Sequence, residues 1–284
     1  MKKLLKAYAL IVPLLAGCLV FTVLPFLSVV QSSFRYGSGG SAAFVGLENF
    51  KKLLQNDMFR LAFGNSMRFL ALGVPLCLAL SYTLAIFLKD LAGRYRLLKA
   101  VFLFPYIMPV AGTVLLIDLL FSDHGAANRL LFFLGLPVAD WLGSPYAFAV
   151  MIALYLWKST GYGVLLLLSG LITIPREQYE AAQMEGATAW HQFRYVTTPQ
   201  MWNSLFVALV FAVVNAFKCF KEMFLVGGEH PNEHVYMLQH YLNNCFANLN
   251  YQRLSTASVL LFAVLFGSFL LLYAWVTYRE EKKL

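Results

Sequence analysis

The chain has 284 residues, of which 60% are hydrophobic and only 13% are charged. Soluble domains carry about a quarter charged residues, so lipid must be the solvent for most of this apolar surface. The formal net charge of +8 comes from short basic clusters between apolar runs, and no single basic face is present. That arrangement orients a protein in a membrane and argues against nucleic-acid binding.

Six stretches of the sequence are long and apolar enough to cross a bilayer, which takes about 20 helical residues. The first is longer than the apolar core of a signal peptide and no small-residue cleavage site follows it, so we expect it to be retained. The predicted fold is an all-α membrane protein forming a single transmembrane domain over residues 1–284. The predicted spans are residues 7–31, 64–88, 100–121, 145–169, 203–226 and 255–277.

The basic residues predict the orientation of these spans. The N-terminus, the loops after the second and fourth spans, and the C-terminus together hold twice as many Lys and Arg residues as the three opposite segments. By the positive-inside rule both termini should be cytoplasmic. The residues on that side are Lys2, Lys3, Lys6, Lys89, Arg94, Arg96, Lys99, Arg176, Arg194, Arg279, Lys282 and Lys283.

The three opposite segments are long enough to form structure of their own. They cover residues 35–63, 122–144 and 227–254, and the first contains apolar residues at helical spacing from Phe50 onward. Such a face suits either the docking of a partner or a lid over the helices, and the sequence leaves both open.

A polar island over residues 175–199 separates the fourth and fifth predicted spans. Pro175 and Glu177 suit the first turn of a helix, where a missing N–H and a negative charge are both favourable. Ala182 and Gly186 lie four residues apart on one face, next to Ala181, and let another backbone approach closely. Gly186 is also the residue type that ends helices.

The second half of the island carries an apolar pair, Trp190 and Phe193, three residues apart among polar neighbours. Pro199 ends the element before the fifth span. A surface-lying amphipathic loop and a helix that inserts into a cytoplasmic partner both fit this pattern.

The spacing within the island resembles the EAA loop of permease subunits of binding-protein-dependent ABC importers. In that loop Glu-Ala-Ala is followed by Gly, an aliphatic residue and Pro at fixed distances, and this chain has Glu180-Ala181-Ala182, Gly186, Val196 and Pro199 there. Glu185 stands where Asp is common, and Thr198 where Leu is usual.

Four other segments resemble the carbohydrate-uptake group of these permeases, the maltose and glycerol-phosphate type. They are residues 44–50 (Phe-Val-Gly-Leu-Glu-Asn-Phe), residues 102–109 (Phe-Leu-Phe-Pro-Tyr-Ile-Met-Pro), Trp157 followed by Gly161, and residues 236–255. Together with the EAA loop they cover most of the chain.

The resemblance implies a multi-pass subunit of the bacterial cytoplasmic (inner) membrane that forms half of the pathway of a sugar importer. Its partners would be a second permease subunit, usually a different chain, two cytoplasmic ATPase subunits that bind ATP and Mg, and an extracytoplasmic solute-binding protein. The loop would couple to the ATPase, and ATP-driven closure would move it and swing the spans. The implied contact residues are Glu180, Ala181, Ala182, Glu185, Gly186, Trp190, Phe193 and Pro199.

The chain itself has no Gly-x-x-x-x-Gly-Lys-Ser/Thr phosphate loop and no catalytic constellation, so we expect neither a cofactor nor enzyme activity. His230 and His234 are four residues apart near Glu229 and Glu233, but Pro231 disfavours the helix that would aim both rings at a metal. We therefore expect no metal site.

Polar residues within the spans are candidates for the solute pathway. Asn215, Lys218 and Glu222 recur at helical spacing in the fifth span, with Lys221 beside them. Such groups usually face a bundle interior or a wet cavity. The alternative is a Lys218–Glu222 pair with snorkelling to the outer interface. Further candidates are Asn65, Asp118 and Trp157, with Lys158 next to Trp157.

Two other classes of protein were weighed. An ion-gradient-driven secondary transporter of small polar solutes needs coupling carboxylates near the midplane and usually has internal repeats. Asp118 and Glu222 are the only deep carboxylates, and no repeat is visible. A membrane-embedded enzyme would need a catalytic cluster at one interface, which is absent. The identity of the sugar stays open.

Overall fold

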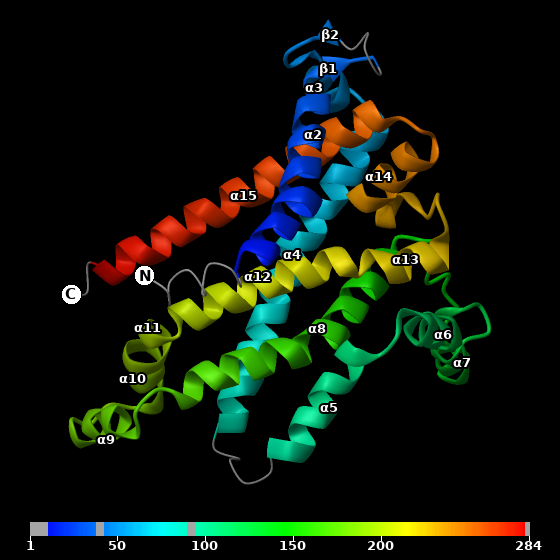
Figure 1. Cartoon of the computed structure of the whole chain (residues 1–284). Helices are drawn as coiled ribbons and strands as arrows, with labels where there is room; N and C mark the ends of the chain where they lie inside the picture. The colour runs from blue at the N-terminus through cyan, green and yellow to red at the C-terminus, as the bar shows by residue number, and fades with distance from the viewer. Residues whose placement is uncertain (1–10, 38–42, 90–94, 282–284) are drawn as a thin grey trace, which may run out of the picture. The chain divides into compact units, whose positions relative to one another are not determined.

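The computed structural model describes residues 11–37, 43–89 and 95–281, which are almost entirely helical (Figure 1). The predicted orientation rests in part on residues outside these ranges, so the side on which the termini lie stays a prediction. Those residues are Lys2, Lys3, Lys6, Arg94, Lys282 and Lys283.

In chain order the elements are η1 (Leu19–Val23), α2 (Leu24–Ser33), β1 (Arg35–Tyr36), β2 (Ala43–Phe44), α3 (Glu48–Leu54), α4 (Asp57–Lys89), α5 (Tyr95–Ile107), α6 (Val110–Phe121), α7 (Ala126–Phe133), α8 (Tyr146–Ile172), α9 (Arg176–Met184), α10 (Ala189–Gln192), η4 (Phe193–Thr197), α11 (Thr198–Gln200), α12 (Trp202–Lys218), α13 (Phe220–Gly227), η5 (Glu233–Val235), α14 (Leu238–Ala247) and α15 (Tyr251–Glu281).

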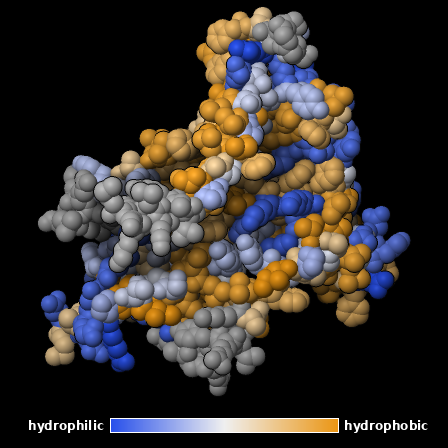
Figure 2. All heavy atoms as spheres, viewed as in Figure 1, coloured by the Kyte–Doolittle hydropathy of each residue, from blue (hydrophilic) through white to orange (hydrophobic). Residues whose placement is uncertain are grey.

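Within the described ranges, six helical segments are long and apolar enough to cross a membrane, in agreement with the predicted number. They are Ile11–Ser33, Asp57–Lys89, Val110–Phe133, Tyr146–Ile172, Trp202–Gly227 and Tyr251–Trp275. Large apolar side chains such as Phe21, Leu119 and Leu271 stay exposed along them. Hydrophobic residues also cover much of the visible face in Figure 2. A surface of this kind is stable only in contact with lipid or with an apolar partner.

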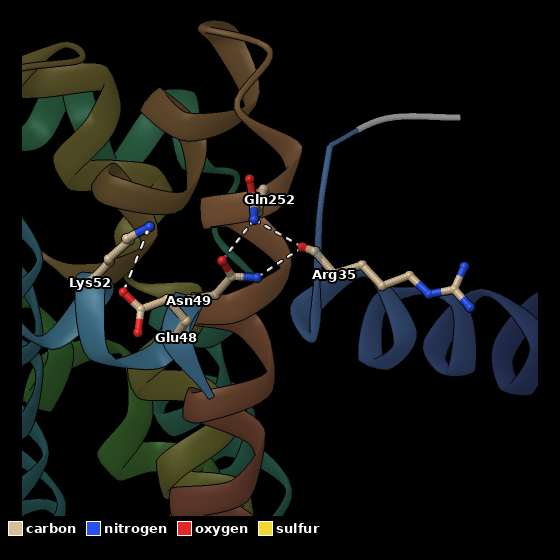
Figure 3. A network of polar contacts seen from close by, with 5 residues as sticks. All are labelled: Arg35, Glu48, Asn49, Lys52 and Gln252. Atoms are coloured by element: carbon tan, nitrogen blue, oxygen red, sulfur yellow. Dashed lines mark hydrogen bonds and ion pairs between the residues drawn. The ribbon is translucent and has the colours of Figure 1, made fainter. Parts of the chain in front are cut away.

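The chain forms two compact units, the first made of Met1–Arg60 and Tyr241–Ser268. In it the buried Asn49 of α3 donates from Nδ2 to the carbonyls of Ser33 and Arg35, each at 2.9 Å. Gln252 of α15 donates from Nε2 to the same Arg35 carbonyl and to Asn49 Oδ1 (Figure 3). Two amide side chains thus join the end of α2, the β1–β2 hairpin, α3 and the start of α15.

The second unit, Leu61–His240 and Phe269–Leu284, is built around α8, which packs against α5 and α12. The Tyr155 hydroxyl of α8 donates to the Ala212 carbonyl of α12 at 2.9 Å. On another face of α8, a Cβ at Gly161 would collide with the backbone carbonyl of Phe102 in α5. The helices therefore approach closely because a glycine occupies the contact.

The third predicted span, residues 100–121, contains Pro105 and Pro109, and the structure shows where its helix is interrupted. The helix is interrupted at Met108 and Pro109, which separate α5 from α6. Pro109 lies in an extended conformation with ψ of 147°. Proline lacks the N–H that a helix needs and disfavours helical geometry at the residue before it, so the break has a local cause.

The fifth predicted span, 203–226, is also interrupted. α12 ends at Lys218 and α13 begins at Phe220, with Cys219 between them. Cys219 keeps helical dihedral angles, with φ of −62° and ψ of −17°, and its N–H donates to the Asn215 carbonyl, so this interruption is a slight distortion of one helix. Both interruptions, in the third and fifth spans, border one cavity, which is described below.

The close contact at Gly161 generates a stability prediction. We expect Gly161→Ala to lower the stability of the chain by about 1–3 kcal/mol, because the added methyl group has no room against the Phe102 backbone. The measurement is thermal unfolding of the detergent-purified protein. The matched control is Gly64→Ala, at a helical glycine whose Cβ would meet open space. Equal melting temperatures for the two variants would contradict the packing argument.

Candidate functional site

The segment between α8 and α12 folds as a chain of short helices with locally determined ends. α9 begins after Pro175 and stops at Gly186, which has φ of +82°. The Gly186 N–H donates to the Gln183 carbonyl, and the Ala187 N–H donates to the Ala182 carbonyl. These bonds satisfy the last carbonyls of the helix, so the expected helix stop at Gly186 is confirmed.

The second part of the segment is capped by Thr188, whose side chain accepts from the His191 N–H at the start of α10. Trp190 and Phe193 contact each other, with ring centroids 5.5 Å apart. Their surroundings differ. Trp190 is 65% exposed, whereas Phe193 is half-buried against Tyr82 of α4, with ring centroids 5.7 Å apart. Phe193 therefore holds the segment to its own chain, and Trp190 is the outward aromatic side chain.

The base of the segment is fixed by polar contacts. The Tyr179 hydroxyl hydrogen bonds to Thr197 Oγ1 at 2.9 Å, and Lys89 Nζ lies 3.6 Å from the centroid of the Tyr179 ring. Arg176 and Glu180 form an exposed ion pair at 3.0 Å. These contacts tie α9 to η4 and to the end of α4, so the segment has a defined attachment to the bundle.

The outer part of the segment has a hollow of about 460 Å³ with apolar side chains beside it. Ala182, Glu185 and Gly186 line it together with residues of α10 and η4. Met184, next to the hollow in sequence, is 90% exposed. Pro199 is half-buried in α11, and Glu180 and Ala181 are exposed. The structure thus places small residues in a concavity and leaves large apolar side chains exposed on the same segment.

A second feature is a polar cavity of about 340 Å³ among the apolar helices. It is bordered by both helix interruptions, through Met108 and Pro109 on one side and Cys219 on the other. Its polar side chains come from α8, α12 and α13, and Tyr106 of α5 contributes an aromatic wall. They are Lys158, Ser159, Asn215, Lys218, Lys221 and Glu222.

The charged groups of the cavity include one buried ion pair. Lys158 Nζ lies 2.5 Å from Glu222 Oε1, and their side chains are 16% and 3% exposed. Lys158 Nζ also donates to Thr113 Oγ1 of α6 at 3.4 Å. Three helices, α6, α8 and α13, are therefore joined by one ammonium group. The structure shows this pair in place of the Lys218–Glu222 pair considered from the sequence.

Five of the candidate pathway residues meet in this cavity, namely Lys158, Asn215, Lys218, Lys221 and Glu222. Asp118 and Trp157 do not line it. Asp118 is exposed on α6, and Trp157 is 38% exposed on α8 beside Lys158. Tyr106 and Ser159 line the cavity without having been predicted. The spacing of polar residues in the fifth span identified the cavity residues that belong to that span. It did not indicate that Tyr106 and Ser159 of neighbouring helices would face them.

Asn65 makes structural contacts, and its place on the solute pathway stays a prediction. Its Nδ2 donates to the carbonyls of Glu233 and Tyr236, and the adjacent Ser66 Oγ accepts from the Leu238 N–H. These bonds fasten the η5 segment to α4. Nearby, burial and then the charge of His230 lower the pKa of His240 to about 4, which keeps that ring neutral near pH 7.

Comparison with known proteins supports a common family. The family described as "Binding-protein-dependent transport system inner membrane component" matches residues 81–284. The trehalose/maltose transport system permease protein MalF of Thermococcus litoralis is 30% identical over 271 residues, covering 94% of this chain and 91% of that protein. The lactose transport system permease protein LacF of Rhizobium radiobacter is 27% identical, covering 98% and 95%.

Solved structures show the same fold. A chain of a bacterial alginate ABC transporter, in complex with a periplasmic protein bound to alginate pentasaccharide, superposes with a TM-score of 0.78 at 19% identity. The match covers 99% of this chain and 96% of that chain. A second structure, of a bacterial ABC transporter involved in the import of alginate, gives a TM-score of 0.79 at 20% identity.

The buried ion pair generates a prediction. We expect Glu222→Gln and Lys158→Met each to destabilise the protein by about 3–5 kcal/mol, because each leaves one charge buried without its partner. The double variant should recover part of the loss, since no buried charge of the pair remains. Thermal unfolding of the purified variants measures this. A double variant whose loss equals the sum of the two single losses would mean that the two groups are not coupled.

Proposed function

Because the chain belongs to the family of binding-protein-dependent transport system inner membrane components, we propose that it is the membrane-spanning subunit through which a sugar crosses a bacterial cytoplasmic membrane. It is a permease subunit of an ATP-driven importer and not itself an enzyme. The sugar assignment rests on relatives whose names specify trehalose, maltose and lactose.

The coupling element in this proposal is the segment over residues 175–199. The observation that carries it is the hollow lined by Ala182 and Gly186, with Met184 and Trp190 exposed nearby in sequence. Burying one apolar side chain of this size against a partner contributes about 1.5–3 kcal/mol. An ATPase subunit on the cytoplasmic side is the partner that we propose. Glu180, Ala181 and Glu185 would lie at the edge of that contact.

Phe193 and Pro199 were predicted to contact the ATPase, but we propose a different role for them. Phe193 packs against Tyr82, and Pro199 is half-buried at the start of α11. We propose that these residues transmit movement of the loop to α4 and α12, whereas Trp190 meets the ATPase. The remaining partners are a second permease subunit, two ATPase subunits and an extracytoplasmic binding protein.

The polar cavity is our proposed section of the solute pathway. Its side chains supply a donor from Ser159 and acceptors from Asn215 and Glu222, the groups that bind sugar hydroxyls. Tyr106 adds a flat apolar face, because its ring stacks on Tyr162 with centroids 4.7 Å apart. Alternating access would open this cavity to one side of the membrane at a time.

A coupling variant tests the role of the loop. We expect Gly186→Asp to reduce solute-stimulated ATPase activity at least about tenfold, which corresponds to about 1.4 kcal/mol, because an aspartate strains the left-handed backbone and places a charged side chain in the hollow that the ATPase would occupy. Gly135→Asp is the matched control, at φ of +70° with open space around it. Full stimulation in Gly186→Asp, with assembly intact, would show that the loop is not the coupling element.

The energy source is tested separately. The chain is reconstituted with its permease, ATPase and binding-protein partners, and sugar uptake is measured with ATP or with an ion gradient alone. We expect uptake only with ATP. Gradient-driven uptake without nucleotide would favour the secondary transporter.

A further inference from the structure

The cavity between α5, α8, α12 and α13 has an excess of positive charge. It is lined by three lysines and one glutamate. Lys158 is neutralised by Glu222, but Lys218 and Lys221 form no ion pair among the described residues and both are exposed. The formal net charge of the lining is therefore positive. A concave site of one sign within low-dielectric walls concentrates ligands of the opposite sign.

The same cavity contains two buried acceptors without partners. Asn215 is 6% exposed and Glu222 is 3% exposed, and Asn215 Oδ1 and Glu222 Oε2 have no hydrogen-bond partner within the described residues. Buried polar atoms are nearly always hydrogen bonded, so these acceptors indicate donors that come from outside the chain. Hydroxyl groups of a solute would supply them.

The two observations together restrict the ligand chemistry. Lysine ammonium groups bind a carboxylate, sulfate or phosphate, but they gain little from a neutral hydroxyl group. The orphaned acceptors require hydroxyl donors, of which sulfate has none and hydrogen phosphate has one. A cavity of about 340 Å³ has room for one sugar unit.

We propose that the cavity is selective for an acidic saccharide, with its anionic group at Lys218 and Lys221 and its hydroxyl groups at Asn215 and Glu222. Lys158 does not contribute to the selectivity, because Glu222 already neutralises it. This inference rests on the proposed function and specifies the class of solute that the same pathway accepts.

The test uses the importer assembled with its second permease and ATPase subunits in phosphatidylcholine nanodiscs, without the binding protein. Labelling of lysines by an amine-reactive reagent is followed by mass spectrometry in the presence of glucose or glucuronate, which differ only at one carbon. We expect glucuronate to protect Lys218 and Lys221 at a concentration at least about tenfold below that of glucose. Lys52, an exposed lysine outside the cavity, should not be protected.

Two variants make the result specific. Lys221→Gln should remove most of the advantage of glucuronate as measured at Lys218, whereas Lys52→Gln should leave it unchanged. Equal protection by glucose and glucuronate, or no protection by either, would overturn the charge selectivity. ATP-driven uptake of a neutral sugar by the same subunits in liposomes, with the binding protein added, would show that the proposed function survives that failure.

The headgroup of an anionic lipid is the other source of an anionic group that could bind at Lys218 and Lys221. The labelling is therefore repeated in phosphatidylglycerol nanodiscs. Protection that depends on phosphatidylglycerol, with no further effect of glucuronate, would identify a lipid headgroup as the occupant and overturn the proposal.

Discussion

The hydrocarbon core of a membrane offers no hydrogen-bond partner to the backbone, and the arrangement of this chain follows from that constraint. Its long apolar segments are helical because a helix pairs its own N–H and C=O groups. Departures from the helix are costly unless protein or water replaces the lost partners. The interruption at Pro109 and the one at Cys219 both border the polar cavity. Only the backbone at Pro109 leaves helical geometry, and it does so beside the polar surroundings of the cavity.

The Lys158–Glu222 pair follows the same principle for side chains. An isolated charge at this depth would be expensive to bury, so each group needs the other. Thr113 adds a third helix to the contact. Once this pair forms, α6, α8 and α13 are held around the cavity, and Lys218 and Lys221 are left as its uncompensated charges. The net charge of the cavity lining is thus carried by the two lysines that do not form an ion pair with Glu222.

The segment over residues 175–199 depends on different forces. Its helix ends are set by Pro175, Gly186 and Thr188, each acting through its own backbone or side chain. Its position depends on contacts from Tyr179 and Phe193 to the end of α4. Local signals therefore shape the segment, and tertiary contacts hold it, which leaves Trp190 and Met184 free to meet a partner.

The sequence by itself determined the number of spans, the helix stop at Gly186 and the family, because apolar length, glycine conformation and motif spacing are local properties of the chain. It also identified four residues of the cavity, since Asn215, Lys218, Lys221 and Glu222 lie close together along one span. Only the tertiary structure decided that Glu222 pairs with Lys158, which lies 64 residues earlier in the sequence. It also decided that Asn65 binds the η5 segment and that Phe193 packs against Tyr82. Those outcomes depend on which helices pack together. The pattern of polar and apolar residues along one helix does not specify which side chains of a neighbouring helix will face it.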